Sequence, residues 1–317
     1  MKDQFEREIS YLRVSVTDRC NLRCQYCMPA EGVCKLARED VLSYEEILEI
    51  VSAAAELGIT KVRVTGGEPL VRPGVPELCA RIGALPGIRE VSVTTNGVLL
   101  ERYAQELKEA GVRRVNVSLD TMNPEKYRTI TGGGELSMVL AGVRAAAEAG
   151  LRPLKLNAVL IGGFNDDEIE AFVELTRDQD IQLRFIELMP LGPGAAFGPE
   201  AYLPGDTVLA RVPELEPEAE DGGVARLYRL PGGKGKVGLI APVNRHFCST
   251  CNRLRLTSEG HLKPCLHSAQ EVPLRGLHGA ALREAVAEAI RQKPAAHGDL
   301  TLGHASEAGR AMNTIGG

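Results

Sequence analysis

The sequence has no apolar run of the roughly 18 residues that a membrane-spanning helix requires. Its first ten residues, MKDQFEREIS, are charged and contain no apolar stretch, so we expect no signal peptide. The chain also has no excess of positive charge. Its formal net charge is −5, which argues against a general nucleic-acid-binding protein. We therefore expect a cytoplasmic protein with neither a membrane nor a nucleic acid as its partner.

The rest of the composition is that of an ordinary globular protein. The 317 residues are 44% hydrophobic and 25% charged, which is enough for one large domain or one domain with an extension. Eight cysteines are present, and in a reducing cytosol clustered cysteines indicate metal or redox chemistry rather than disulfides.

Short β-rich runs alternate with helical patterns through the first two-thirds of the chain. The predicted strands are Tyr11–Val16, Lys61–Thr65, Glu90–Thr94, Arg113–Leu119, Pro153–Leu160 and Ile181–Leu188. The predicted helices include Tyr44–Leu57, capped by Ser43 and Glu46, then Ser137–Ala149 and Asp166–Arg177. This alternation predicts βαβ units and a parallel sheet, which is either curved into an open barrel or doubly wound.

A polar face recurs on strand after strand. In Lys61–Thr65, for example, Val62 and Val64 alternate with Arg63 and Thr65, and three later strands alternate in the same way. Fully buried parallel strands should instead be almost continuously apolar. Because burying these polar groups without partners would be costly, we predict an incomplete (βα)6 TIM-like barrel whose open lumen holds a polar ligand. The sixth strand is less clear, because Leu183, Phe185, Glu187 and Met189 share a face.

The composition changes after Met189. We expect the barrel to occupy residues 1–190 and a Gly- and Pro-rich crossover or linker to occupy 191–224. Residues 225–317 form the predicted C-terminal region. It contains a hairpin of Ala225–Leu230 and Lys236–Ala241, and a helix at Ala280–Arg291.

The first cysteine set is Cys20, Cys24 and Cys27, with spacing C-x3-C-x2-C in the loop after the first strand. Three thiolates can bind three irons of a [4Fe–4S] cluster and leave the fourth iron open, whereas a structural zinc normally takes four ligands. A zinc site or free thiols remain the alternatives. Thr65-Gly66-Gly67-Glu68-Pro69 follows the second strand and is either a close approach to a ligand or an ordinary turn.

The second cysteine set is Cys248, Cys251 and Cys265. Taken alone, it could be a zinc ribbon completed by the nearby His261 or His267. Arg253 and Arg255 follow it directly, on one face of a predicted strand. They can hold phosphates by forked hydrogen bonds, or they can be solvated surface charges.

Both motifs of the barrel part resemble those of the radical S-adenosylmethionine (SAM) superfamily. With the C-terminal CSTCNRLRL segment and the final Gly-Gly, nearly the whole chain is similar to the GTP 3′,8-cyclase family of molybdenum cofactor biosynthesis. This resemblance implies two [4Fe–4S] clusters, held by the two cysteine sets, and SAM as cofactor. It also implies that GTP is converted, through a 5′-deoxyadenosyl radical, to (8S)-3′,8-cyclo-7,8-dihydroguanosine 5′-triphosphate.

The resemblance also assigns roles to single residues. Those matched to SAM contacts are Tyr26, Gly67, Ser118 and Met189. Those matched to GTP contacts are Arg13, Arg63, Thr94, Lys155, Arg253 and Arg255. The family's terminal glycines reach into the active site, which makes Gly316 and Gly317 candidates for a catalytic role. No role is assigned to Asn157 or Glu187. Cys79 is interpreted as part of a helix core, and Cys34 as a loop thiol.

The family resemblance further implies an electron donor, a homodimer and a downstream pterin-forming enzyme as partners. Two other functions stay open at this point. One is a radical SAM enzyme that modifies a peptide and carries an auxiliary cluster. The other is a non-enzymatic zinc-ribbon binding protein.

Overall fold

The computed structural model of the chain describes every residue except 30–31, 33–34, 220–222, 299, 301–305 and 317. Two residues singled out in the sequence, Cys34 and Gly317, therefore lie outside the described part.

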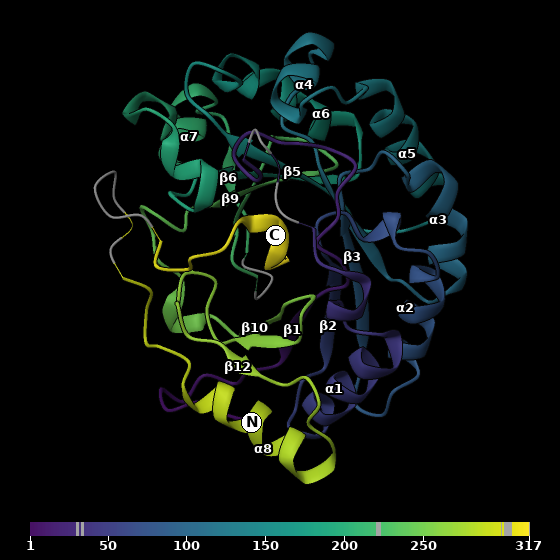
Figure 1. Ribbon diagram of the computed structural model, residues 1–317. Coiled ribbons are helices and arrows are strands. Elements are labelled where there is room, and N and C mark those ends of the chain that lie inside the picture. Colours follow the sequence, from purple (N-terminus) through teal and green to yellow (C-terminus); the bar gives the residue numbers. More distant parts are fainter. Residues whose placement is uncertain (30–31, 33–34, 220–222, 299, 301–305, 317) are drawn as a thin grey trace.

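Six parallel strands lie side by side in chain order and curve around a central space (Figure 1). They are β1 (Tyr11–Ser15), β2 (Lys61–Thr65), β3 (Glu90–Thr95), β4 (Arg114–Ser118), β5 (Leu154–Leu160) and β6 (Ile181–Glu187). Each predicted strand is confirmed to within one residue at either end. The incomplete (βα)6 barrel is likewise confirmed.

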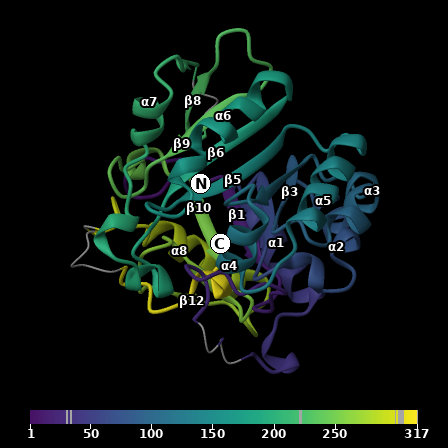
Figure 2. The ribbon, with the colours of Figure 1, turned by 90° about the horizontal axis from the view of Figure 1, so that it is seen from above.

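Six helices follow these strands and cover the outside of the sheet. They are α1 (Tyr44–Glu56), α2 (Val75–Gly83), α3 (Leu100–Glu109), α4 (Pro124–Thr131), α5 (Leu136–Glu148) and α6 (Ile169–Asp178). Seen from above, α2, α3 and α5 lie along one side of the strands (Figure 2). The predicted capping box of α1 is present. The Ser43 hydroxyl accepts a hydrogen bond from Glu46 N at 3.1 Å, and Ser43 N donates to the Glu46 carboxylate at 2.7 Å.

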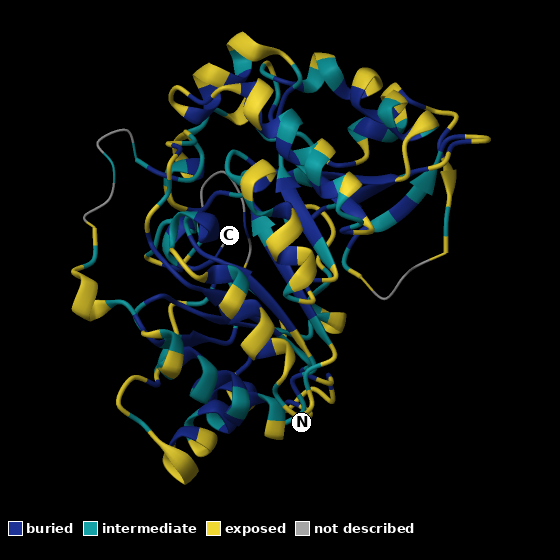
Figure 3. Cartoon of the chain, turned by 90° about the vertical axis from the view of Figure 1, so that its right-hand side faces the viewer, coloured by how far each residue is buried: buried dark blue, intermediate teal, exposed yellow. Residues whose placement is uncertain are grey.

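The two faces of the strands differ in the way that the polar alternation predicts. Val62, Val64 and their counterparts on the other strands pack under the helices in one continuous hydrophobic cluster. The alternate positions face the lumen. Strand β6, which was unclear from sequence, follows the same rule, because Leu183 belongs to the core while Arg184 lines the cavity. Figure 3 shows this burial as dark blue strands beneath helices with exposed yellow faces.

The C-terminal part of the chain extends both edges of this sheet. On one edge, β9 (Lys236–Ile240) pairs parallel with β6, and β8 (Arg226–Arg229) and β7 (Glu216–Pro217) follow it. The predicted hairpin of β8 and β9 is thereby confirmed. On the other edge, β10 (Arg253–Leu256) pairs parallel with β1, followed by β11 (His261–Lys263) and β12 (Val272–Pro273).

Two further helices belong to this part. The short α7 (Thr207–Arg211) lies within the predicted linker, and α8 (Gly279–Arg291) packs against α1. The chain then returns to the middle of the barrel, where a short 3-10 turn, Met312–Thr314, lies inside the ring of strands (Figure 1). Among the described residues, no helix has the length and apolar character needed to cross a bilayer.

Candidate active site

A single cavity at the carboxyl ends of the barrel strands is lined by both predicted cysteine sets. The cysteines that line it are Cys20, Cys24, Cys27, Cys248, Cys251 and Cys265. Its position agrees with the usual place of active sites in barrels, where the loops that follow the strands meet. The two sets, which are more than two hundred residues apart in sequence, therefore face the same space.

The first cysteine loop is held by the glycines that follow β2. Gly67 N donates to Thr17 O at 2.7 Å, and Glu68 N donates to Arg19 O at 2.8 Å. A Cβ atom added to Gly66 would lie 2.7 Å from Thr17 O, so a larger residue would push the two segments apart. The glycines thus allow close approach of the backbone that leads into Cys20, as well as lining the cavity.

Glu68 joins the ends of β2 and β3 beneath the same loop. Its buried carboxylate accepts hydrogen bonds from Thr95 Oγ1 at 2.8 Å and from Asn96 N at 2.6 Å, and burial raises the pKa of Glu68 to about 7. The Asn96 side-chain amide in turn donates to Cys20 Sγ at 3.8 Å and to Asn21 Oδ1 at 2.8 Å. Glu68 and Asn96, at the ends of β2 and β3, therefore fix the orientation of the Cys20 side chain.

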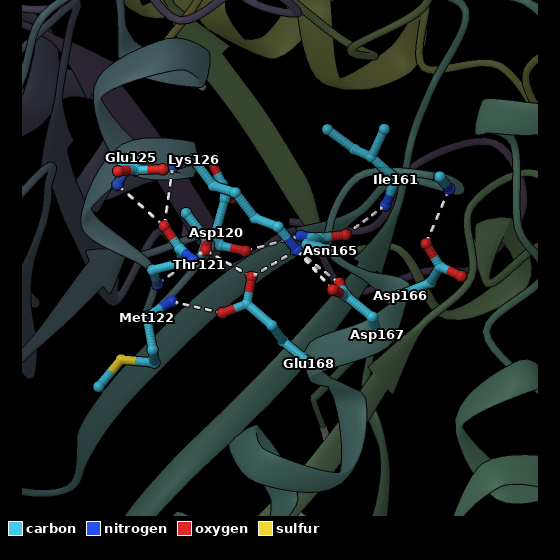
Figure 4. A network of polar contacts seen from close by, with 12 residues as sticks. Asp120, Thr121, Met122, Glu125, Lys126, Ile161, Asn165, Asp166, Asp167 and Glu168 are labelled. Atoms are coloured by element: carbon cyan, nitrogen blue, oxygen red, sulfur yellow. Dashed lines mark hydrogen bonds and ion pairs between the residues drawn. The ribbon is translucent and has the colours of Figure 1, made fainter.

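Asp120, just after β4, holds the aromatic side chain of the same loop. Tyr26 Oη donates to Asp120 Oδ2 at 2.7 Å, and Asp120 Oδ1 accepts from Val159 N at 2.9 Å. Figure 4 shows how the loop around Asp120 is fixed. Asn165 Nδ2 donates to Asp120 O at 2.7 Å, and Glu168 accepts from Thr121 Oγ1 at 2.6 Å. Burial raises the pKa of Asp120 to about 6.

The environment of the first set suits a metal cluster rather than free thiolates. Burial raises the pKa of Cys20, and raises that of Cys27 to about 12. The pKa of Cys24 is raised well above its usual value by burial and by the charge of Asp120. A cation must therefore replace the proton before these sulfurs can act as thiolates, as happens when iron is bound.

The second set has cationic neighbours instead. Burial alone would raise the pKa of Cys248, but hydrogen bonds with His297 outweigh it and lower the pKa. For Cys251, burial is likewise outweighed, chiefly by the charge of Lys293. The Lys293 ammonium is buried and donates to Arg253 O at 2.8 Å and Pro264 O at 2.7 Å, which fixes it beside the cysteines.

One group of side chains near the second set has the geometry of a single-ion site. Ligand atoms of His246, Cys248 and His297 lie within 4.8 Å of one another. Neither histidine named from sequence belongs to this group, although the ring of His267 lies 4.9 Å from that of His297, centre to centre. His267 lines the cavity and contacts Ser306 Oγ at 3.0 Å, whereas His261 lies on β11, 3.6 Å from Glu259. His297, far along the chain, gave no sequence signal of its own.

A row of arginines on three neighbouring strands lines the same cavity. The register of β10, β1 and β2 sets Arg255 opposite Arg13 and Arg13 opposite Arg63, so their side chains lie on one face. Burial lowers the pKa of Arg13, and the charges of Arg255 and Arg63 lower it further. Three buried cations side by side repel one another, so an anion placed among them would be stabilised.

The ring of Tyr11 contacts Arg63 of this row and also Arg253 on β10. The guanidinium carbons of Arg63 and Arg253 are 5.5 Å and 5.8 Å from the centre of its ring. Burial alone would raise the pKa of Tyr11, but the charges of Arg63 and Arg13 outweigh it and lower the pKa. Tyr11 was not singled out from sequence, because its role depends on the pairing of β10 with β1.

Several buried polar atoms around the lumen have no hydrogen-bond partner among the described residues. They are Thr94 Oγ1, both side-chain polar atoms of Asn116, Asn157 Oδ1 and Arg253 Nε. All four residues line the cavity. Because an unsatisfied buried polar group costs about 1–3 kcal/mol, such a concentration of them indicates a site built for a polar ligand.

The structure brings most of the other candidate residues to this cavity as well. Ser118 and Met189 line it, and the Gly316 carbonyl accepts hydrogen bonds from Arg13 Nε at 3.0 Å and Arg255 Nη1 at 2.5 Å. Lys155 is buried on β5, in register with Asn116, and does not line the cavity directly. Glu187 holds a loop, because its carboxylate accepts from Gly205 N at 2.8 Å.

Comparison with known proteins decides the family. Residues 14–176 match the profile described as Radical SAM superfamily, and residues 181–299 match that described as Molybdenum Cofactor Synthesis C. The GTP 3′,8-cyclase of Alkaliphilus oremlandii is 52% identical over 321 residues, covering 100% of both chains. That of Peptoclostridium acidaminophilum is 53% identical over 300 residues, covering 93% of this chain and 92% of the relative. The chain belongs to the GTP 3′,8-cyclase family.

Solved structures show the same fold at greater distance. Streptococcus suis SuiB superposes with a TM-score of 0.59 at 14% identity, covering 91% of this chain and 66% of SuiB. The hydrogenase maturase HydG of Carboxydothermus hydrogenoformans gives a TM-score of 0.52 at 19% identity, covering 67% of this chain and 52% of HydG. Membership of the radical SAM superfamily implies one [4Fe–4S] cluster and SAM, and the half-buried trio at Cys20, Cys24 and Cys27 fits that cluster.

Several residues of the GTP 3′,8-cyclase site were missed from sequence. Arg184 could have been found from its alternation with Leu183 on β6. Asn96 and Asp120 follow strands β3 and β4 directly, a position that in a barrel points to the active site. Lys293 carries no comparable signal, because only the folding of the C-terminal region brings it beside Cys251.

Proposed function

We propose that this protein is a GTP 3′,8-cyclase that joins C3′ of the ribose of GTP to C8 of its guanine. The observation that carries the proposal is one cavity lined by both cysteine trios and by an arginine row on β10, β1 and β2. When bound at the first trio, the [4Fe–4S] cluster and SAM supply a 5′-deoxyadenosyl radical, which is the hydrogen-abstracting agent of the superfamily.

The second trio, Cys248, Cys251 and Cys265, holds a second [4Fe–4S] cluster in this proposal. Three thiolates leave one iron open, and a cluster with an open iron can take a nitrogen or oxygen ligand from a substrate. The cationic neighbours Lys293 and His297 offset the negative charge that three thiolates bring to a buried site.

The arginine row binds the triphosphate of GTP. Guanidinium groups form forked, charge-assisted hydrogen bonds with phosphate oxygens, and Arg13, Arg63 and Arg255 present three such groups on one face. The bound polyanion would also relieve the mutual repulsion that lowers the pKa of Arg13. Arg253, on the same strand as Arg255, adds a further guanidinium group, and its buried Nε lacks a hydrogen-bond partner among the described residues.

Tyr26, Gly67, Ser118 and Met189 contact SAM in this proposal. Thr94 acts with the arginines on GTP, and so does Lys155, which is buried in register with the cavity-lining Asn116. The side chains around the lumen have two further tasks. They hold the ribose close to the first trio, and they exclude water, because a radical reaction needs a fixed geometry and a closed site. The tail contributes the Gly316 carbonyl, which accepts hydrogen bonds from Arg13 and Arg255. Gly317, the other glycine proposed to be catalytic, lies outside the described residues.

The experiment is anaerobic incubation of the reduced protein with SAM and GTP deuterated at C3′. In the proposed reaction GTP loses one hydrogen atom, closes a ring and then gains one electron and one proton. The product therefore has the elemental formula of GTP, and chromatography rather than mass must separate the two. The proposal predicts a new isomer of GTP and deuterium in 5′-deoxyadenosine. Formation of 5′-deoxyadenosine without deuterium, and without the isomer, would contradict it.

One observation favours a second candidate, a zinc-binding C-terminal region. His246, Cys248 and His297 are arranged as ligands of a single ion. Metal and sulfide analysis of protein purified without air separates the two functions. About eight irons and eight sulfides per chain would support two clusters, whereas zinc with about four irons would support a zinc site at His246, Cys248 and His297.

A ligand-binding experiment distinguishes the cyclase from the alternative of a radical SAM enzyme that modifies a peptide. In the cyclase proposal GTP raises the melting temperature of the protein and peptides do not. An electron donor, a homodimer, a pterin-forming enzyme that takes the product, and a cytoplasmic location stay predictions from the family resemblance.

A further inference from the structure

Arg310 anchors the C-terminal tail to the antiparallel strands β10, β11 and β12, which we call the β10–β12 hairpin. Arg310 Nε and Nη2 donate to the two oxygens of Glu271 at 2.6 Å and 2.8 Å, and Nη1 donates to Glu259 Oε2 at 2.8 Å. The side chains of Arg310 and Glu271 are only 22% and 17% exposed. A forked, largely buried pair of this kind is stronger than an exposed ion pair and fixes the direction of the guanidinium.

The carboxylate partner is itself held in place. Lys263 on β11 lies 3.1 Å from Glu271 Oε1 and donates to Ser268 O at 2.7 Å, and its side chain is 1% exposed. The segment between Lys263 and Glu271 contains Cys265, and β10 of the same hairpin contains Arg255. The hairpin that receives Arg310 therefore also carries a cysteine of the second set and an arginine of the row.

From this anchor the tail runs into the lumen over six residues. Asn313 Nδ2 donates to Asp18 O at 3.1 Å, close to the first cysteine loop, and Ile315 is fully buried. The Gly316 carbonyl then meets Arg13 and Arg255. Gly316 has φ +71°, and a Cβ there would lie 2.7 Å from Thr65 Cγ2, so this narrow path requires glycine.

A chain end that must fill a narrow site loses much conformational entropy on insertion. Fixing it a few residues from its tip raises the effective concentration of the tip at the site, since the remaining segment explores a small volume. Arg310 lies six residues before Gly316 and outside the residues that line the cavity, so it can restrain the tail without occupying the site.

We propose that Arg310 is a positioning residue whose pairing with Glu259 and Glu271 holds the tail inserted, so that Gly316 reaches the arginine row. This inference rests on the proposed function, because it takes the inserted tail to be the active arrangement. It adds to that function a link between the tail and the hairpin that bears Cys265 and Arg255.

The test compares Arg310→Met and Arg310→Lys with Arg291→Met in the full-length, cluster-loaded protein. Arg291 is a matched control, because it also bridges two glutamates, Glu284 and Glu288, but on the exposed face of α8. The first readout is the rate at which carboxypeptidase removes the last residues under anaerobic conditions, and it needs no turnover. The second is kcat and KM for GTP, with iron content measured for each variant.

We expect Arg310→Met, which removes three charge-assisted hydrogen bonds but leaves the other contacts of the tail, to be digested at least about tenfold faster and to lose at least about tenfold in kcat. Iron content should not change. Arg310→Lys should lie between the parent and Arg310→Met, because it keeps the charge and loses the fork. Arg291→Met should match the parent in both readouts.

Equal digestion of Arg310→Met and the parent would overturn the anchor, whatever the activity. Faster digestion with unchanged kcat would also overturn it, because the held position would then serve no step of the reaction. If Arg310→Met loses iron, the Arg310→Lys variant decides by the same two readouts. Failure of the parent to form product would instead contradict the proposed function, and digestion alone would still report on the anchor.

Discussion

The two cysteine sets line one cavity but lie in opposite electrostatic surroundings. Near the first, buried Asp120 adds to the effect of burial and raises the pKa of Cys24. Near the second, His297 and Lys293 outweigh burial and lower the pKa of Cys248 and Cys251. Thiols of the first set therefore need a bound cation to release their protons. At the second set, neighbouring cationic side chains already favour the thiolate form of Cys248 and Cys251.

This difference corresponds to the work proposed for each set. The first set is surrounded by strand ends and by hydrogen bonds from Asn96 and Tyr26 that fix the loop. The second set borders the arginine row through β10, so its surroundings favour anions. A polyanionic substrate is therefore directed to the side of the second set.

Loss of one cysteine from each set should separate the two roles most strongly. Cys24→Ala should abolish both 5′-deoxyadenosine and cyclised product, because SAM cleavage depends on the first set. Cys251→Ala should abolish the product yet still form 5′-deoxyadenosine, since the first set is intact. Chromatography of both compounds after anaerobic incubation measures the split. Equal loss of 5′-deoxyadenosine in both variants would remove the proposed division of labour.

The arginine row gives the next largest effect. Arg253→Ala combined with Arg255→Ala should weaken GTP binding by about 100-fold, because charge-assisted hydrogen bonds to phosphate are each worth about 1.5–3 kcal/mol. SAM binding and iron content should stay as in the parent. Calorimetric titration with GTP and with SAM measures both, and Arg211→Ala, an exposed ion-pair residue on α7, is the control. Unchanged GTP affinity would exclude these two arginines from the substrate site.

Thiol reactivity in metal-free protein tests the electrostatic contrast directly. At pH 8, Cys248 and Cys251 should be alkylated at least about tenfold faster than Cys24 and Cys27, because one unit of pKa changes the thiolate fraction about tenfold. Mass spectrometry of peptides after brief iodoacetamide treatment gives the rates. Slower alkylation of Cys248 and Cys251 than of Cys24 and Cys27 would contradict the proposed difference in thiol pKa between the two sets.

The smallest effect concerns Asp120. Its folded pKa of about 6 lies above the ordinary value of 3.8, so the folded state binds the proton more tightly than the unfolded chain. Asp120 should therefore reduce stability as the pH rises from about 4 to 6, by about 3 kcal/mol in total. Asp120→Asn should remove that slope in urea unfolding of metal-free protein. An unchanged slope would show that Asp120 is not the group responsible.

The sequence predicted the barrel well, because its information is local. Alternation such as Val62, Arg63, Val64 reports directly which strand face is buried, and the capping box of Ser43 marks where a helix begins. The cysteine spacing likewise identified both trios.

What the sequence could not predict depends on pairing between distant segments. The parallel pairing of β10 with β1 puts Arg253 beside Tyr11 and completes the arginine row, and nothing local to CSTCNRLRL encodes that neighbour. The positions of Lys293 and His297, and the Arg310 contacts, likewise arise only when the C-terminal region folds back onto the barrel.

Two iron–sulfur centres and one nucleotide are proposed to share the cavity that both cysteine sets line. The most direct measurement is Mössbauer and electron paramagnetic resonance spectroscopy of air-free protein, with and without GTP and SAM. We expect two [4Fe–4S] centres, of which SAM perturbs one and GTP the other, with the GTP-sensitive centre missing in Cys251→Ala. A single centre in the parent protein, or GTP and SAM acting on the same one, would contradict it.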